Sequence, residues 1–265
     1  MQIGKSVRIE RIINRNTGRT IIVPMDHGVS VGPLKGLRNM RRAVNDMVKG
    51  GANAVLMHKG LVRCSHREEG GDVGLIVHLS ASTSLSPTPN AKTLVGTVED
   101  GLRLGADAVS VHVNLGDETE SKMLSDLGEV ASAATSWGVP VLAMVYARGP
   151  KIKDEFDPEV VAHCARMGEE LGADIVKVSY TGNVETFGEV VDGCCIPVVI
   201  AGGPKLDSTR DFLQMVSDSI TAGGAGLSVG RNVFQHKNRV RLVQALHKIV
   251  HEDVSVDDAL KYIGE

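Results

Sequence analysis

The sequence is poor in aromatic residues and has no large excess of charge of either sign. Phe, Trp and Tyr make up 3% of its 265 residues, and the formal net charge is -3 with a pI near 6.3. Proteins that bind nucleic acid or anionic membranes rely on basic patches, and many nucleic-acid binders also stack bases on aromatic rings. We therefore expect no nucleic acid and no membrane among the partners of this protein.

Cysteines are few, and their spacing does not suit a cross-linked or zinc-bound fold. The four residues Cys64, Cys164, Cys194 and Cys195 form no CxxC pair. Neither a disulfide framework nor a zinc knuckle is therefore expected. Free cysteine behaves as a small apolar side chain, so we expect buried thiols.

Long apolar runs are missing as well. No segment approaches the roughly 20 consecutive apolar residues that cross a membrane. The first segment, residues 1–16, carries several charges and lacks the apolar core of a signal peptide. We expect a soluble, cytoplasmic protein.

The chain does contain a regular alternation of strand-like and helix-like patterns. Eight short apolar runs occupy residues 20–25, 54–58, 75–79, 108–113, 139–145, 174–178, 197–201 and 226–229. Helical patterns between them include residues 37–49, 93–104, 119–137, 158–171, 208–222 and 238–250, and several close on glycine before the next run. This alternation predicts an α/β fold, a single (β/α)8 TIM barrel.

We expect one barrel domain over residues 1–265, with an extension at each end. Residues 1–16 should pack their apolar side chains over the barrel floor, and residues 254–265 should form a short helix. The second unit is the weakest, because residues 60–71 are too short and charged for a full helix. A doubly wound open sheet is therefore the alternative, although no GxGxxG follows the first run.

Lys177 lies inside the sixth apolar run. An ammonium group buried without a partner is costly and usually loses its proton, and a neutral lysine amine attacks carbonyl carbons. Side chains alternate between the two faces of a strand, so Lys177 shares a face with Ile175 and should point into the barrel. We expect it to form a Schiff base. The structural alternative is a strand-end lysine paired with Asp174 or Glu185 in solvent.

Two further residues could transfer protons at the same site. Catalytic groups of such barrels lie at the carboxyl ends of the strands, where Asp26 follows the first run and Tyr146 the fifth. An imine mechanism needs one group that donates protons and one that accepts them. Taken alone, Asp26 could be a turn residue and Tyr146 a rim aromatic.

Glycine-rich turns follow the last two barrel strands. Gly202 and Gly203 come after the seventh run, and Gly230 and Arg231 after the eighth, where these barrels commonly bind phosphate. Arg231 and Arg148 would add positive charge. The alternative is that the glycines only permit tight turns.

Four histidines, His27, His58, His78 and His112, also fall at predicted strand ends. They could build a zinc site like that of a metal-dependent aldolase, but no HxH or HExxH spacing occurs. We expect no metal and no cofactor, with the histidines contacting substrate hydroxyls or satisfied in the core.

With these residues in place, the chain resembles the archaeal class I aldolase family over nearly its whole length. The resemblance rests on the motifs at residues 23–30, 108–114, 146–150, 174–182, 200–205 and 228–235. It implies that Lys177 forms the Schiff base, Tyr146 donates protons and Asp26 accepts them. It also implies substrate contacts by Asp26, His27, Gly28, Val29, Ser30, Tyr146, Ala147, Arg148, Lys177, Gly202, Gly203, Gly230 and Arg231.

The activity that the resemblance implies is a transaldolase-type condensation. A three-carbon ketone fragment of the sugar phosphate 6-deoxy-5-ketofructose 1-phosphate would be transferred to L-aspartate semialdehyde, early in an alternative route to dehydroquinate and aromatic amino acids. Family members assemble as rings, so the resemblance also implies a homo-oligomer, commonly a decamer.

Three other functions stay open at this point. A class I fructose-1,6-bisphosphate aldolase would use the same three catalytic residues. A related thiolase acts on a phosphorylated signalling sugar, and a barrel that only binds a phosphorylated effector would leave Lys177 inert.

Overall fold

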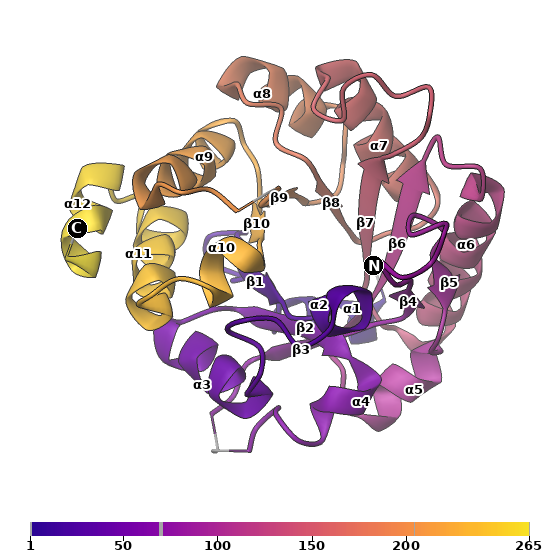
Figure 1. Cartoon of the computed structure of the whole chain (residues 1–265), viewed down its shortest axis with the longest axis horizontal. Coiled ribbons are helices and arrows are strands. Elements are labelled where there is room, and N and C mark those ends of the chain that lie inside the picture. Colours follow the sequence, from indigo (N-terminus) through magenta and orange to yellow (C-terminus); the bar gives the residue numbers. More distant parts are fainter. Residues whose placement is uncertain (1, 69–70, 204, 265) are drawn as a thin grey trace.

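The computed structural model describes residues 2–68, 71–203 and 205–264. Eight parallel strands close into a barrel in the order β1-β10-β9-β8-β7-β6-β3-β2, with helices around the outside (Figure 1). The strands are β1 (Thr20–Pro24), β2 (Ala54–His58), β3 (Gly74–His78), β6 (Ala108–Leu115), β7 (Val141–Ala147), β8 (Ile175–Val178), β9 (Val198–Ala201) and β10 (Gly226–Ser228). The predicted (β/α)8 barrel is confirmed, and the open-sheet alternative is excluded.

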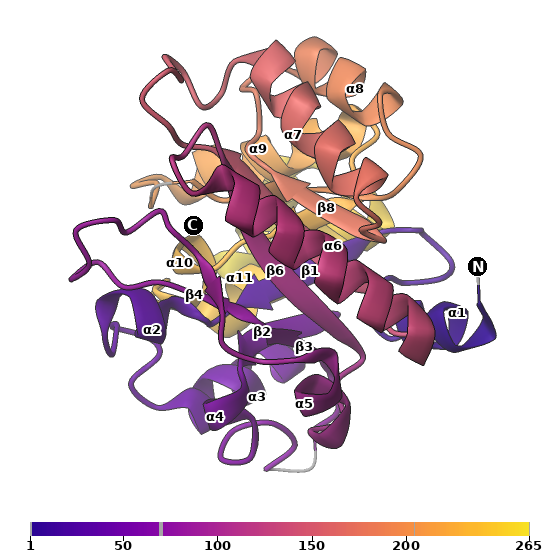
Figure 2. The ribbon, with the colours of Figure 1, turned by 90° about the vertical axis from the view of Figure 1, so that its right-hand side faces the viewer.

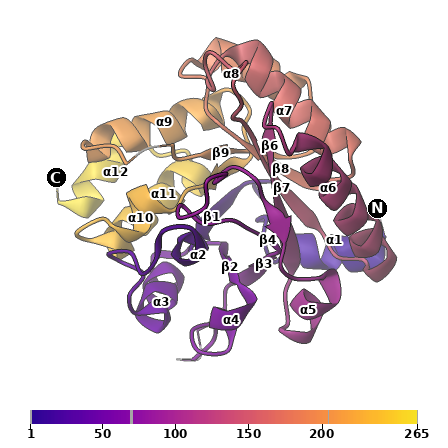
Figure 3. The same cartoon turned by 45° about the vertical axis from the view of Figure 1, so that its right-hand side comes forward.

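Twelve helices occur in the part of the chain that the structure describes. They are α1 (Ile3–Ile9), α2 (His27–Val31), α3 (Met40–Gly50), α4 (Lys59–Val62), α5 (Val98–Arg103), α6 (Glu120–Trp137), α7 (Pro158–Glu170), α8 (Val184–Asp192), α9 (Thr209–Thr221), α10 (Arg231–Phe234), α11 (Arg239–Glu252) and α12 (Val256–Ile263). Figure 3 shows α12 beside α9 and α11. Met1 and Glu265, the predicted domain ends, and Pro204 of a predicted motif lie outside the described residues.

The barrel has two separate apolar layers because strand side chains alternate. One layer lies between the strands and the helices. The other fills the barrel interior and includes Ile22, Leu142, Ile175 and Val199. Burial of this kind stabilises a protein by roughly 25 cal/mol per Å² of apolar surface, so both layers hold the barrel closed.

The N-terminal segment closes the amino end of the barrel. Ile12 and Ile13 are buried in the interior layer, while Val7 on α1 is 59% exposed. Lys5 forms a 2.8 Å ion pair with Asp174, just before β8. Figure 2 shows α1 at one end of the barrel and α2, α10 and β4 at the other. The N-terminal segment therefore covers the floor of the barrel.

The fold differs from the sequence prediction in the segment after β3. A helix was expected from residue 93, but Thr93 and Leu94 form strand β5 (Thr93–Leu94), which pairs antiparallel with β4 (Ser80–Ala81). Helix α5 begins only after Thr97, whose side chain forms a capping box with Asp100. This cap satisfies the first N–H groups of the helix, so the helix does not extend further back.

The prediction of buried cysteines is wrong for two of the four residues. Cys164 is buried against the barrel, but Cys64 and Cys195 are exposed, and Cys194 is half-buried. Local sequence could not show this, because Cys64, Cys194 and Cys195 lie in short connecting segments whose exposure depends on the neighbouring units. No helix among the described residues is long and apolar enough to cross a membrane.

Candidate active site

A cavity of about 580 Å³ opens at the carboxyl ends of the barrel strands. Lys177 on β8, Tyr146 on β7 and Asp26, which follows β1, all line it. The same cavity receives the glycine turns after β9 and β10. The fold thus brings together residues that lie up to 205 positions apart in the sequence, from Asp26 to Arg231.

Lys177 points into this cavity from the inner face of its strand. In the barrel register it lies between Met144 on β7 and Val199 on β9. The residue is 7% exposed, and its Nζ lies 4.0 Å from Met144 Sδ. No carboxylate among the described residues is within ion-pair distance of it, and Asp174, one suggested partner, is held by Lys5 at the opposite end. Lys177 is therefore a buried amine with a soft, weakly polar neighbour.

Asp26 provides a carboxylate in the same cavity as the Lys177 amine. It occupies the N-cap position of α2 without a capping hydrogen bond from its side chain, which is 21% exposed. His27 Nδ1 lies 3.6 Å and His78 Nε2 3.9 Å from its carboxylate oxygens. Burial opposes ionisation, but His78, His27 and Lys177 together hold the pKa of Asp26 below its usual range. Asp26 is thus a carboxylate at neutral pH and can accept a proton.

The histidines around Asp26 are held neutral. Burial lowers the pKa of His78 to about 4, against the pull of Asp26. Its Nδ1 lies 2.7 Å from Ser110 Oγ, which fixes the ring. Burial also lowers the pKa values of His27 and His58, and that of His112 falls well below its usual range. Neutral imidazoles can hydrogen-bond substrate hydroxyls as donors or as acceptors.

Tyr146 forms the wall between Lys177 and the outer rim. The Lys177 Nζ lies 6.0 Å from the centre of its ring, and the Arg148 guanidinium carbon lies 4.7 Å from the same centre. The ring of His112 packs at 5.1 Å. These contacts hold the phenol ring in place beside the amine, where its hydroxyl can exchange protons with a bound substrate.

The glycine turns approach each other closely. A Cβ on Gly202 would lie 2.3 Å from Val229 Cγ1, and one on Gly230 would lie 2.8 Å from the Pro24 carbonyl oxygen. Arg231 donates a 3.0 Å hydrogen bond to the Gly203 carbonyl oxygen and so links the two turns. Packing alone therefore requires two of these glycines, and the turns also line the cavity that contains Lys177.

Three of the expected substrate contacts lie off the cavity wall. Ser30 and His27 line it, but Gly28 and Val29 do not, and Val29 is 42% exposed on the far side of α2. Ala147 is 3% exposed and packs in the outer apolar layer, because it follows Tyr146 and so takes the other face of β7.

Sequence reasoning missed two charged residues of the cavity, Lys92 and Glu155. Lys92 lies between β4 and β5 and lines the cavity, with its Nζ donating a 2.5 Å hydrogen bond to Ser82 Oγ. Residues 80–84 also form part of the cavity wall. A lone lysine in a polar loop carries no sequence signal; only the β4–β5 pairing brings it over the barrel mouth.

Within the described residues, one group of side chains has a geometry that could hold a metal ion. Potential ligand atoms of Asp26, His58 and His78 lie within 4.8 Å of one another. Zinc binds imidazole nitrogens at about 2.0–2.1 Å, so such a site would have to contract around the ion. The Ser110 contact leaves His78 Nε2 facing this group.

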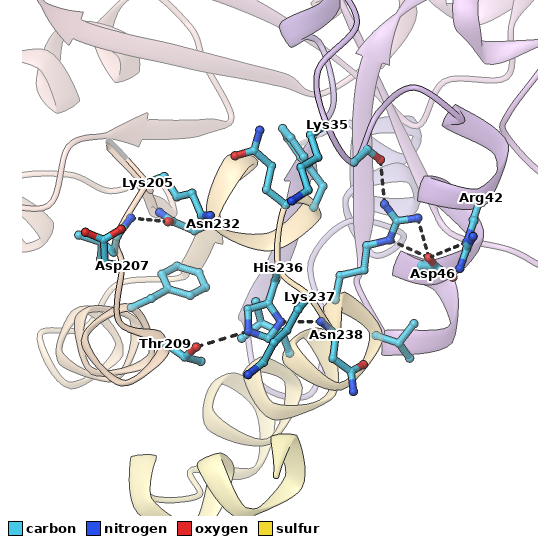
Figure 4. A pocket seen from close by; sticks show the side chains of 18 of the residues that line it. Lys35, Arg42, Asp46, Lys205, Asp207, Thr209, Asn232, His236, Lys237 and Asn238 are labelled. Carbon is cyan, nitrogen blue, oxygen red and sulfur yellow. Dashed lines mark hydrogen bonds and ion pairs between the residues drawn. The ribbon is translucent and has the colours of Figure 1, made fainter. Parts of the chain in front are cut away.

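A larger cavity, of about 1020 Å³, lies outside the barrel mouth where α3, α10 and the amino ends of α9 and α11 meet (Figure 4). Its charged lining includes Lys35, Arg42, Lys205 and Lys237, with Asp46 on one wall. Asp46 is held by Arg239 at 2.6 Å. The buried Lys177 amine and the Asp26 carboxylate with its neighbouring histidines line the smaller cavity instead, so the smaller cavity is the candidate active site.

Known proteins resemble this chain over nearly its full length. The DeoC/LacD family aldolase model matches residues 20–236. The chain is 45% identical over 262 residues to 2-amino-3,7-dideoxy-D-threo-hept-6-ulosonate synthase 1 of Archaeoglobus fulgidus, with 99% of this chain and 96% of that protein covered. It is 43% identical to the synthase of Halobacterium salinarum, with 98% and 97% covered. It is 42% identical to 2-amino-4,5-dihydroxy-6-oxo-7-(phosphonooxy)heptanoate synthase of Streptomyces griseus, with 94% and 90% covered.

Solved structures agree with this relationship. A Schiff-base-forming fructose-1,6-bisphosphate aldolase superposes with a TM-score of 0.86 at 31% identity, covering 93% of this chain and 100% of that one. An archaeal fructose-1,6-bisphosphate aldolase, with its catalytic lysine bound to the carbinolamine intermediate, gives 0.86 at 30% identity, with 93% and 99% covered. The protein is thus an aldolase-type enzyme, and its chain belongs to the DeoC/LacD aldolase family.

Proposed function

We propose that this enzyme joins L-aspartate semialdehyde to the three-carbon ketone fragment of 6-deoxy-5-ketofructose 1-phosphate and forms 2-amino-3,7-dideoxy-D-threo-hept-6-ulosonate. The observation that carries the proposal is the buried Lys177 amine, without a carboxylate partner, in one cavity with Tyr146 and Asp26. The two archaeal relatives at 45% and 43% identity, which carry the name of this synthase, support the choice of reaction.

The first step is attack of Lys177 Nζ on the ketone carbon that is distal to the phosphate. The adduct is a carbinolamine, and loss of its hydroxyl as water leaves an imine on Lys177. Tyr146 supplies the proton that the departing hydroxyl needs. An iminium group can accept the electron pair of the bond between its α and β carbons, which prepares this α–β bond for cleavage.

The second step is exchange of one aldehyde for another. Asp26 takes the proton of the hydroxyl next to the breaking bond, a three-carbon phosphate aldehyde departs, and an enamine remains on Lys177. The enamine carbon then attacks the aldehyde carbon of L-aspartate semialdehyde, whose oxygen takes up the proton. Addition of water releases the product and restores the Lys177 amine.

The remaining expected substrate contacts belong to this proposal. His27, Ser30, Arg148, Gly202, Gly203, Gly230 and Arg231 line the cavity and are assigned to the substrates, whereas the other expected contacts, Gly28, Val29 and Ala147, lie off its wall. We further assign the reaction to an early step of an alternative route to dehydroquinate and aromatic amino acids, in the cytoplasm, in a homo-oligomer with the decameric ring of its family.

A class I fructose-1,6-bisphosphate aldolase is the second candidate function. The two aldolase structures with a TM-score of 0.86 favour it, and the same three groups would perform the cleavage. Glycine turns beside Arg231 would suit a phosphate on the ketone fragment, which fructose bisphosphate carries. The two candidates differ in the ketose phosphate that is cleaved and in the acceptor that the enamine meets.

Comparison of donors separates the two candidates. The enzyme should form the heptulosonate from 6-deoxy-5-ketofructose 1-phosphate only when L-aspartate semialdehyde is present, as mass spectrometry of the products can show. Borohydride with the donor should fix an adduct on the peptide that contains Lys177. Efficient cleavage of fructose bisphosphate without any heptulosonate would overturn the proposal in favour of the aldolase.

The assigned proton carriers and the metal alternative can be tested in the same assay. Asp26→Asn and Tyr146→Phe should each lower kcat by about 10² to 10⁴-fold, the usual contribution of a general acid or base. Asp26→Asn should still trap donor on Lys177. EDTA should leave activity unchanged; inhibition that zinc reverses would instead favour a metal at Asp26, His58 and His78.

A further inference from the structure

The rim of the catalytic cavity carries a second set of charges that take no part in the bond-making and proton-transfer steps described above. Lys92 lies between β4 and β5, and Arg148 and Glu155 follow β7; we call these three residues the rim cluster. All three line the same cavity as Lys177. The chain thus places two cations and one carboxylate above the reacting amine.

The rim cluster lies at a distance from Lys177 that matches a short carbon chain. Arg148 stacks 4.7 Å from the centre of the Tyr146 ring, and Lys177 Nζ lies 6.0 Å from the same centre. The guanidinium carbon is therefore within about 11 Å of Nζ, the length of a six-carbon chain of roughly 1.5 Å bonds that ends in a hydrogen bond. An acceptor aldehyde bonded to the enamine would extend its far end to this point.

The positive charges of Lys92 and Arg148 in the rim cluster repel each other. Burial and the neighbouring Arg148 charge lower the pKa of Lys92, with Asp26 acting in the opposite direction. The Lys92 ammonium has three N–H donors, and Ser82 Oγ accepts one of them at 2.5 Å. An anion between Lys92 and Arg148 would relieve their repulsion and accept hydrogen bonds from both.

Glu155 adds a negative charge beside these cations. Its Oε2 lies 3.6 Å from Arg148 Nε, and both side chains are about 40% exposed, at 39% and 41%. Such an exposed pair contributes little stability, so its charges are available to a ligand. An α-amino acid carries its ammonium and carboxylate on one carbon, and therefore needs opposite charges this close together.

The barrel topology separates the rim cluster from the glycine turns. In the closed strand order, β3 lies opposite β9, and β6 lies opposite β10. Lys92 follows β3, whereas Gly202 and Arg231 follow β9 and β10. Lys92 thus reaches the cavity from the side opposite the glycine turns, and Arg148 and Glu155 follow β7, midway between β3 and β9 in the closed order.

We propose that Lys92 and Arg148 bind the carboxylate of the acceptor aldehyde and that Glu155 binds its α-ammonium group. The rim cluster would thereby select an amino-acid aldehyde among the aldehydes that the enamine could attack. This proposal rests on the proposed function, in which L-aspartate semialdehyde is the acceptor.

Three acceptor aldehydes of equal chain length test the carboxylate contact and the ammonium contact separately. They are L-aspartate semialdehyde, succinic semialdehyde, which lacks the amino group, and butanal, which lacks both charges. Lys92→Met should raise KM about tenfold for the first two and leave butanal unchanged, since a hydrogen bond to a charged group is worth about one to two powers of ten. Glu155→Gln should raise KM only for L-aspartate semialdehyde.

Matched controls show whether the effects belong to the rim. Lys261→Met on α12 and Glu129→Gln on α6 remove the same charges far from the cavity and should change none of the three KM values. Lys92→Arg should restore most of the selectivity for carboxylates. Borohydride trapping of the donor on Lys177 should remain in every variant, which also shows that each has folded.

The outcomes distinguish this proposal from the proposed function. If the wild type traps no donor or makes no heptulosonate, the proposed function fails. If it does both, but Lys92→Met and Glu155→Gln leave the ratios of KM among the three acceptors as in the wild type, the rim cluster does not bind the acceptor. A KM for butanal that rises as much as the others would equally overturn the proposal.

Discussion

The two ends of the barrel use the same residue types in opposite ways. At the floor, Lys5 and Asp174 form a 2.8 Å ion pair, and Asp174 also accepts a 2.9 Å hydrogen bond from the Val141 backbone N–H. At the mouth, Lys177 and Asp26 line one cavity, but their side chains form no ion pair at 4.0 Å or less. The floor satisfies its charges, and the mouth leaves its amine and carboxylate available.

This difference separates stability from reactivity within one fold. The Arg11 side chain repeats the floor arrangement with Asp107, at 2.6 Å, and Asp107 in turn accepts a 2.9 Å bond from the Leu75 backbone N–H. Such contacts join the N-terminal segment to β3 and β8. A buried amine without a partner has the opposite effect, because its desolvation is not offset. Natural enzymes often retain such destabilising groups where activity needs them.

Replacing Lys177 should give the largest change of all, and it should shift catalytic activity and stability in opposite directions. We expect Lys177→Met to lower kcat by about 10⁴-fold or more, because the residue proposed to form the covalent adduct is lost. The free energy of unfolding should rise by about 1 kcal/mol, since a thioether needs no hydration in the apolar interior. Steady-state assays and urea denaturation measure the two effects.

A Lys177→Met enzyme that is active but less stable would contradict this difference between the floor and the mouth of the barrel. That result would make the lysine a structural group like Lys5. Lys261→Met on the exposed α12 is the matched control, and it should alter neither activity nor the urea midpoint by a measurable amount.

Acid should weaken both ends of the barrel, because each holds a neutral histidine. Burial lowers the pKa to about 4 for His78 at the mouth and for His251, which bonds Asn53 and Thr17 near the floor. Their folded pKa lies below the unfolded value of about 6.5, so the unfolded chain binds more protons between these values. Stability should be full above pH 6.5 and fall toward pH 4, by about 3 kcal/mol for His78 alone.

Urea unfolding at a series of pH values measures this loss. His251→Gln should flatten the pH dependence between pH 6.5 and 4 without changing kcat at neutral pH, because the residue lies far from Lys177. A wild-type free energy of unfolding that stays constant, or increases, as pH falls through this window would contradict the buried neutral state of both histidines.

The floor pair should give the smallest effect, and one on stability alone. Lys5→Met should lower the free energy of unfolding by about 2 kcal/mol, less than the loss of a fully buried pair, because Asp174 keeps its bond to Val141 N–H. kcat and KM of the folded enzyme should stay unchanged. A Lys5→Met enzyme of full stability but reduced kcat would show that the floor also positions the catalytic groups.

Regular strand patterns made most of the fold predictable. The eight apolar runs correspond to the eight barrel strands, because buried parallel strands carry continuous apolar sequence. The start of the helix expected over residues 93–104 was wrong, since the apolar residues there suit either a helix or a short strand, and only pairing with Ser80 and Ala81 decides between them. Lys177 could be singled out because a lysine inside a buried strand has few structural explanations.

The candidate site was predictable where a residue sits on a strand end and unpredictable where a loop folds back. Asp26 and Tyr146 follow from their positions at the ends of β1 and β7. Lys92 does not, because its place in the cavity depends on the antiparallel β4–β5 pair. The same holds for Glu155, which follows Arg148 by seven residues in an irregular segment.

The sequence by itself determined the barrel and the inward face of Lys177. Both follow from local physics, since hydrophobic periodicity sets the strands and the alternation of side chains sets their faces. Only the tertiary structure decided which charges meet: Lys5 pairs with Asp174, while no carboxylate of the described residues lies within 4.0 Å of the Lys177 amine. Such pairings depend on closure of the barrel, which joins segments distant in the chain by a geometry that no local pattern encodes.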